Sequence, residues 1–180
     1  KETYQYINYL LIVALIMIII SQLLYYILVN YFLVHYKDSS TMFIIYSSMI
    51  YFYAMFIIPS AILSSSVMRK EKVIALIMFI GVISSIIFNA VFLNFGWKGE
   101  GIALGTVLSQ LVIAGLTLFY FKKYSKMLFF RHIYEILLLT TVIIIYSGSF
   151  YYMAINNYQL WNLILCCFIG LSTLLLITKL

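Results

Sequence analysis

Charged residues are scarce in this chain, and acidic residues are the scarcest of them. Only 9% of the 180 residues are Asp, Glu, Lys or Arg, and only five are acidic. A soluble domain carries about 25% charged and 45–50% apolar residues, whereas this chain is 66% hydrophobic. The composition therefore excludes a soluble globular domain, a disordered chain and a nucleic-acid binder.

Cysteine is rare as well. The two cysteines, Cys166 and Cys167, are adjacent within an apolar run. Neighbouring residues of a helix point in different directions, so the pair predicts no disulfide framework. The simpler interpretation is that both are small apolar residues of a packed helix.

Long apolar runs fill most of the chain. A membrane helix needs about 20 mostly apolar residues, and six such segments can be placed along this sequence. They are Tyr6–Val34, Met42–Ser65, Val73–Leu93, Gly101–Phe121, Ile133–Met153 and Leu160–Thr178. We therefore expect an all-α, polytopic membrane helix bundle that forms a single transmembrane domain over residues 1–180, with short loops.

Basic residues are unevenly distributed between the predicted loops. Two loops hold most of them: Arg69, Lys70 and Lys72 after the second span, and Lys122, Lys123, Lys126 and Arg131 after the fourth. Alternate sides of the membrane receive nine and two basic residues. By the positive-inside rule, both termini and both of these loops are predicted to be cytoplasmic. Trp97 and Trp161 then fall at the outer boundary, as in an aromatic belt.

Ionisable side chains are nearly absent from the predicted spans. Those closest to a span lie at its end or in a loop: His35, Lys37, Asp38, His132 and Glu135. Embedded carboxylates and histidines are the usual carriers of proton or ion coupling, and no His/Glu cluster here has metal-ligand spacing. HExxH, GxSxG and P-loop motifs are also missing. We therefore expect no catalytic residue, no metal and no cofactor, and a protein that is not an enzyme.

Small or polar residues recur every four positions on two predicted spans, which places them on one face of each helix. They are Gly81, Ser85 and Asn89 on the third span, and Gly101, Gly105 and Ser109 on the fourth. Such faces allow close antiparallel packing of the two helices. The alternative interpretation is that Asn89 faces a polar cavity.

Pro59 is the single proline, and it lies near the end of the second predicted span. It removes one backbone hydrogen bond, so we expect a kink there. The following serines, Ser60 and 64–66, lead into the basic segment 69–72. This stretch is either a flexible gate or an ordinary helix end.

A family resemblance is carried by the stretch from Asn89 to Gln110. Its residues are similar to the pattern Asn, Phe-Gly, Gly-x-Ala-x-Ala-Thr and Ser-Gln, with Lys98 and Glu100 where the pattern has small or apolar residues. The matching positions are Asn89, Gly96, Gly99, Gly101, Ala103, Gly105, Thr106 and Ser109. This stretch resembles bacterial polysaccharide flippases, the O-antigen (Wzx-type) transporters of the superfamily that also contains MATE exporters.

The resemblance implies a structural or cavity role for those residues. It also implies that the chain is the C-terminal half of a two-bundle protein of the bacterial inner membrane, whose N-terminal half is missing here. The implied function is translocation of an undecaprenyl-pyrophosphate-linked oligosaccharide by alternating access. Membrane lipids and the missing half are the other expected partners.

Arg69 and Arg131 are the residues whose guanidinium groups would contact the substrate phosphate, because the guanidinium fork binds phosphate oxygens through two bonds. The alternative is that these arginines only set topology. Three other functions stay open. They are a MATE-like drug or cation exporter, a membrane enzyme such as an O-antigen polymerase, and a structural subunit of a larger complex.

Overall fold

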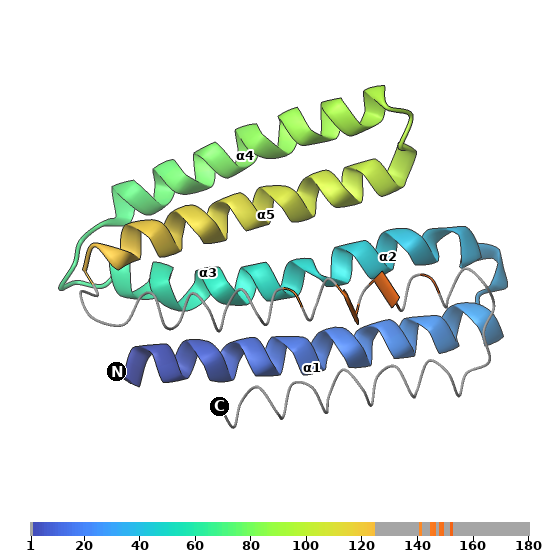
Figure 1. The fold of residues 1–180 in the computed structure, drawn as a ribbon, viewed down its shortest axis with the longest axis horizontal. Helices are drawn as coiled ribbons and strands as arrows, with labels where there is room; N and C mark the ends of the chain where they lie inside the picture. Colours follow the sequence, from blue (N-terminus) through green and yellow to red (C-terminus); the bar gives the residue numbers. More distant parts are fainter. Residues whose placement is uncertain (1, 125–140, 142–144, 147, 150–151, 153–180) are drawn as a thin grey trace.

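A computed structural model describes residues 2–124, 141, 145–146, 148–149 and 152 of the chain. Within this part the regular structure is entirely helical (Figure 1). The elements are α1 (Glu2–Tyr31), a 3-10 helix η1 (Val34–Ser39), α2 (Ser40–Ser47), α3 (Met49–Leu63), α4 (Glu71–Asn94) and α5 (Lys98–Lys122).

Four stretches are long and apolar enough to cross a membrane: Tyr9–Tyr31, Ser40–Leu63, Glu71–Asn94 and Lys98–Lys122. They match the first four predicted spans to within three residues at every end. The predicted all-helical architecture of apolar spans is therefore confirmed for this part of the chain. The fifth predicted span falls mostly, and the sixth wholly, outside the described residues, so the count of six stays a prediction.

The helices run alternately up and down, so their ends gather at two opposite ends of the bundle (Figure 1). Helix α3 lies between α1 and α5, and α4 packs on the far side of α5. The start of α1, the α3–α4 loop and the end of α5 therefore share one end, at the left in Figure 1. The α1–α2 connection and the α4–α5 turn share the other.

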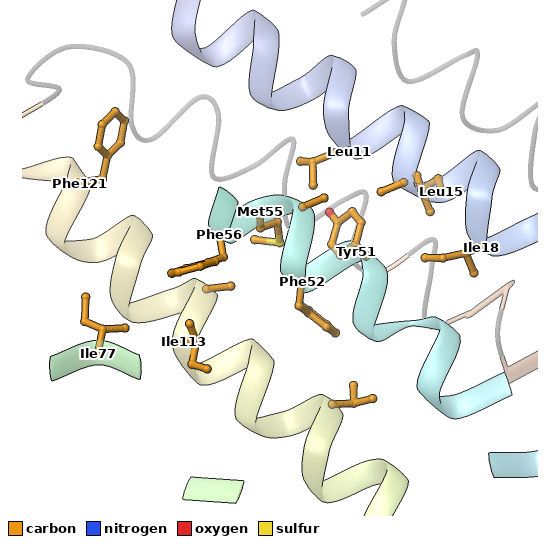
Figure 2. Packing of buried hydrophobic residues seen from close by; sticks show 14 of the residues in the cluster. Leu11, Leu15, Ile18, Tyr51, Phe52, Met55, Phe56, Ile77, Ile113 and Phe121 are labelled. Carbon is orange, nitrogen blue, oxygen red and sulfur yellow. The ribbon is translucent and has the colours of Figure 1, made fainter. Parts of the chain in front are cut away.

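The core lies between α1, α3 and α5 (Figure 2). Helix α3 contributes the largest share of it, with Tyr51 fully buried between α1 and the rest of the cluster. The other residues of the cluster that Figure 2 labels are Leu11, Leu15 and Ile18 of α1, Phe52, Met55 and Phe56 of α3, Ile77 of α4, and Ile113 and Phe121 of α5. Because lipid is as apolar as these side chains, shape-matched contact is what holds such helices together in a bilayer.

Helix α4 is the most exposed of the four spans, since only 11% of its apolar window is buried. Large apolar side chains point outward along it, among them Leu76, Phe79, Val82 and Ile86. Exposure of such an apolar surface to water is unfavourable, whereas lipid tails solvate it. The exposed face of α4 therefore fits a helix at the edge of a membrane bundle.

The second span is interrupted at Ser48, between α2 and α3. There the Ser48 N–H donates to the carbonyl of Ile45 at 3.2 Å, one residue short of the regular helical partner. The hydroxyls of Ser47 and Ser48 also donate back to carbonyls of their own helix, at 2.7 and 2.6 Å. Such back-bonding is a known cause of helix distortion. Pro59, where the sequence predicted a kink, lies inside α3, which continues to Leu63.

Candidate functional site

The turn that joins α4 to α5 is a Schellman cap centred on Gly96. Gly96 has φ of +80°, and its N–H donates to Leu93 O at 3.0 Å, while the N–H of Trp97 reaches Phe92 O at 3.1 Å. The rings of Phe92 and Trp97 stack, with centroids 5.6 Å apart. This is the apolar contact that accompanies the motif. Gly96 therefore serves the turn through its backbone conformation.

Gly105 and Gly101 bring α5 into close contact with α4. A Cβ at Gly105 would overlap Oδ1 of Asn89 and lie 3.0 Å from the Asn89 backbone nitrogen. A Cβ at Gly101 would lie 2.8 Å from the Cβ of Phe92. The close antiparallel approach predicted from the small-residue spacing is present. Gly81, two helical turns before Asn89 on the same face of α4, lies against the side chain of Ile113 of α5.

Asn89 lies in this interface. Its Oδ1 is buried and has no hydrogen-bond partner, and its Nδ2 lies 3.5 Å from Ser85 Oγ, which is long for a hydrogen bond. Of the two interpretations of Asn89, helix packing is the one that the position of Oδ1 favours. An unpaired buried oxygen is costly in a bilayer, so this atom is a point of weakness in the α4–α5 contact.

The four other helical residues of the motif are buried, in contact with a neighbouring helix or hydrogen-bonded to their own helix. Gly99 lies against the side chain of Met42 on α2, and Ala103 is fully buried. Thr106 and Ser109 donate their hydroxyls to backbone carbonyls of their own helix, at 2.9 and 2.7 Å. All eight motif residues therefore lie on one hairpin. Asn89, Gly101 and Gly105 form its interhelical contact, and Gly99 meets α2.

A buried polar contact between α1 and α2 was missed in the sequence. Gln22 is 1% exposed, and its Nε2 donates to Ser47 Oγ at 2.5 Å and to the carbonyl of Ile44 at 3.3 Å. Its Oε1 is buried without a hydrogen-bond partner. The available signal was weak: Ser21 and Gln22 interrupt the first apolar run, and Ser47 and Ser48 interrupt the second.

This contact compensates for the helix break. In a regular helix Ile44 O would accept the N–H of Ser48, but that group turns to Ile45 O. Ile44 O accepts from Ser47 Oγ and Gln22 Nε2 instead. A carbonyl freed inside a membrane span must find such partners, because no water is there to bind it.

A second polar contact follows along α1. The hydroxyl of Tyr25 lies 2.6 Å from Ser39 Oγ, and its ring stacks on Phe43 with centroids 3.9 Å apart. Tyr25 is one helical turn beyond Gln22, so both residues face α2 and its entry. The interior between α1 and α2 is thus polar without any charge.

The α3–α4 loop is closed by backbone hydrogen bonds. The N–H groups of Arg69 and Lys70 donate to Ser65 O and Leu63 O, each at 2.9 Å. Arg69 adopts a positive φ of 49°, a conformation that non-glycine residues rarely take. Of the two interpretations of this stretch, these bonds favour an ordered helix end. Arg131, the other predicted phosphate contact, lies outside the described residues.

The end of α5 meets this loop. The hydroxyls of Tyr120 and Tyr124 lie 3.3 Å apart. The pKa of Tyr124 is lowered, chiefly by its hydrogen bond with Tyr120; burial opposes this shift, and the positive charges of Lys70 and Lys123 add to it. The charges of the α3–α4 loop therefore act on the end of α5 at this end of the bundle.

Comparisons with known protein families, with curated proteins and with solved structures found no match to this chain. In the part of the chain that the structure describes, no three His, Cys, Asp or Glu side chains are grouped so that they could hold a metal ion. The class that fold and composition define is a helical membrane protein with a close-packed hairpin, an uncharged polar interior and one basic end.

Proposed function

We propose that the chain is part of a membrane flippase that moves a lipid-linked oligosaccharide across the bacterial inner membrane by alternating access. The observation that carries the proposal is the resemblance of the stretch 89–110 to polysaccharide flippases. Its eight motif residues lie on one close-packed hairpin, α4–α5. A rigid hairpin of this kind suits a bundle that rocks as a unit.

The uncharged polar interior supports this substrate class. Gln22 and Ser47 place amide and hydroxyl groups inside the membrane-spanning region, beside the break between α2 and α3. In many transporters substrate sites are formed at interrupted membrane helices. Amide and hydroxyl groups bind sugar hydroxyls, and they do not attract a cationic drug as an embedded carboxylate would.

The basic end supports a substrate that carries pyrophosphate. Among the described residues this end holds Arg69, Lys70, Lys72, Lys122 and Lys123, whereas the opposite end holds Lys37 and Lys98. In this proposal the basic end and both termini face the cytoplasm, the side that the positive-inside rule favours and on which the lipid-linked substrate is made. In this proposal Arg69 and Arg131 help to gather the phosphate groups.

Deletion of the gene tests the proposal against its rivals. We expect surface polysaccharide to be lost and the lipid-linked repeat unit to accumulate on the cytoplasmic face. A polymerase-type enzyme would instead leave single repeat units on the cell surface. An exporter would leave polysaccharide normal and raise drug sensitivity. Either of these last two results would overturn the flippase proposal.

A further inference from the structure

The backbone of the second span is tightened on both sides of Ser48. The N–H of Ser48 donates to Ile45 O, and the N–H of Tyr51 donates to Ser48 O, each at 3.2 Å. Both bonds reach three residues back along the chain, whereas those of a regular α-helix reach four. A short stretch of this kind inside a helix often marks a hinge.

The two sides of this break are held very differently. On α3, seven of the 15 residues are buried, and Tyr51 lies fully buried in the core (Figure 2). On α2, only Ile44 and Ser47 of the eight residues are buried, and neither belongs to the core cluster. Helix α3 is therefore the fixed side of the break, and α2 is the side that is able to move.

The broken conformation is held by Gln22 of α1, and it is incompletely satisfied. The Gln22 amide donates to Ser47 Oγ and to Ile44 O, but its own oxygen is buried without a hydrogen-bond partner. In an unbroken helix Ile44 O would accept the N–H of Ser48 and would not need Gln22. The observed conformation thus gains side-chain bonds and carries one unpaired oxygen, while the unbroken one gains a main-chain bond. The two are close competitors.

The packing of α2 against its neighbours allows a change of angle. The rings of Tyr25 and Phe43 stack 3.9 Å apart with only 8° between their planes, and parallel rings stay in favourable contact when they are offset. On the other side Met42 lies against Gly99 of α5, and methionine adapts readily to a changed gap. A swing of α2 would break the hydrogen bond of Tyr25 with Ser39, which keeps the unbroken conformation in the minority.

We propose that Ser48 is a hinge in the second span and that Gln22 is the latch that keeps it closed. In the latched state, which is the one in the structure, Gln22 caps Ile44 O. In the unlatched state Ser48 N–H returns to Ile44 O, and α2 changes its direction relative to α3. The start of α2 then moves at the end of the bundle that holds the α4–α5 turn (Figure 1). The inference concerns an equilibrium of the chain itself, so it does not depend on the proposed function.

A distance measured across this end of the bundle tests the hinge. Spin labels are placed at Tyr36→Cys, shortly before α2, and at Phe95→Cys in the α4–α5 turn, two exposed positions. The full-length protein, in a background without other cysteines, is measured in lipid nanodiscs by pulsed electron paramagnetic resonance. We expect one main distance and a second, minor one. Gln22→Leu should raise the ratio of the second to the main distance roughly fivefold, the effect of one ordinary hydrogen bond.

Ser48→Ala tests the other half of the mechanism without removing a core side chain. The Ser48 hydroxyl donates to Ile45 O of its own helix at 2.6 Å, and such back-bonding distorts helices. Its loss should also raise the ratio, and Gln22→Leu/Ser48→Ala should raise it further than either change alone.

Two matched variants control for general loosening. Ser60→Ala removes the same kind of bond, from Ser60 Oγ to Ile57 O at 2.8 Å, on α3 away from the break. Gln110→Leu repeats the glutamine replacement on α5. Both should keep the wild-type ratio, and thermal unfolding verifies that each variant is folded. The hinge is disproved if Gln22→Leu/Ser48→Ala shows only the main distance, or if either control raises the ratio as much as Gln22→Leu.

Discussion

The backbone of Gly105 lies directly against Asn89, so that a Cβ at position 105 would lie 3.0 Å from the Asn89 nitrogen and would overlap its side-chain oxygen. Helices α4 and α5 therefore meet so closely here that any larger side chain at position 105 would require Asn89 or the helices to shift. Because lipid provides no hydrophobic force between helices, the close contact itself supplies much of the stability of the hairpin.

Replacement of Gly105 by leucine should force the two helices apart. We expect Gly105→Leu to destabilise the fold by about 1–3 kcal/mol, the usual cost of overpacking, as measured by thermal unfolding in detergent. Gly115→Leu is the matched control on the same helix, because a Cβ at Gly115 has no neighbour within 4 Å. Equal stability of the two variants would show that the contact at Gly105 does not hold the hairpin.

The cap at Gly96 needs a different test, because it requires glycine for the backbone conformation and not for space. A Cβ there meets nothing within 4 Å, but φ is +80°. Gly96→Ala should therefore cost about 1–2 kcal/mol through backbone strain, and Gly96→Asn less, since asparagine tolerates this region better. Gly115→Ala controls for the addition of a methyl group to the helix. If Gly96→Ala unfolds at the wild-type temperature, the strain is absent.

The contact of Gln22 and Ser47 with Ile44 O can be tested by removing its two donors in turn. Ser47→Ala leaves the Ile44 carbonyl with only the 3.3 Å bond from the Gln22 amide. We expect a loss of about 0.5–1.5 kcal/mol in thermal unfolding in detergent. The double variant Ser47→Ala/Gln22→Leu should lose more, because it removes both donors from the carbonyl that the helix break has freed. A double variant at least as stable as Ser47→Ala would contradict this account of the contact.

The four spans of the described part were predictable because composition and run length suffice to locate them. The α4–α5 contact was also predictable, since glycine and serine spacing marks a helix face. Gln22 was not recognised, because a single glutamine in an apolar run has the same appearance whether it faces lipid, water or Ser47. The break at Ser48 was missed for a related reason. A serine pair distorts a helix only where a neighbouring group donates to the freed carbonyl, and here that donor, Gln22, is distant in sequence. Pro59 gave the more obvious signal for a distorted helix, and α3 continues past it to Leu63.

The orientation of the bundle can be tested at the two ends of α4. Ser66 lies in the α3–α4 loop and Asn94 at the last turn of α4, and both are exposed. Single cysteines at these positions, in a background with Cys166→Ser and Cys167→Ser, can be treated with a membrane-impermeant thiol reagent. The nine-to-two distribution of basic residues predicts that Ser66 faces the cytoplasm. In intact cells we therefore expect Asn94→Cys to react and Ser66→Cys to stay unlabelled, while permeabilised cells should label both. Labelling of Ser66→Cys alone in intact cells would reverse the orientation and would place the basic end on the side where no lipid-linked precursor is made.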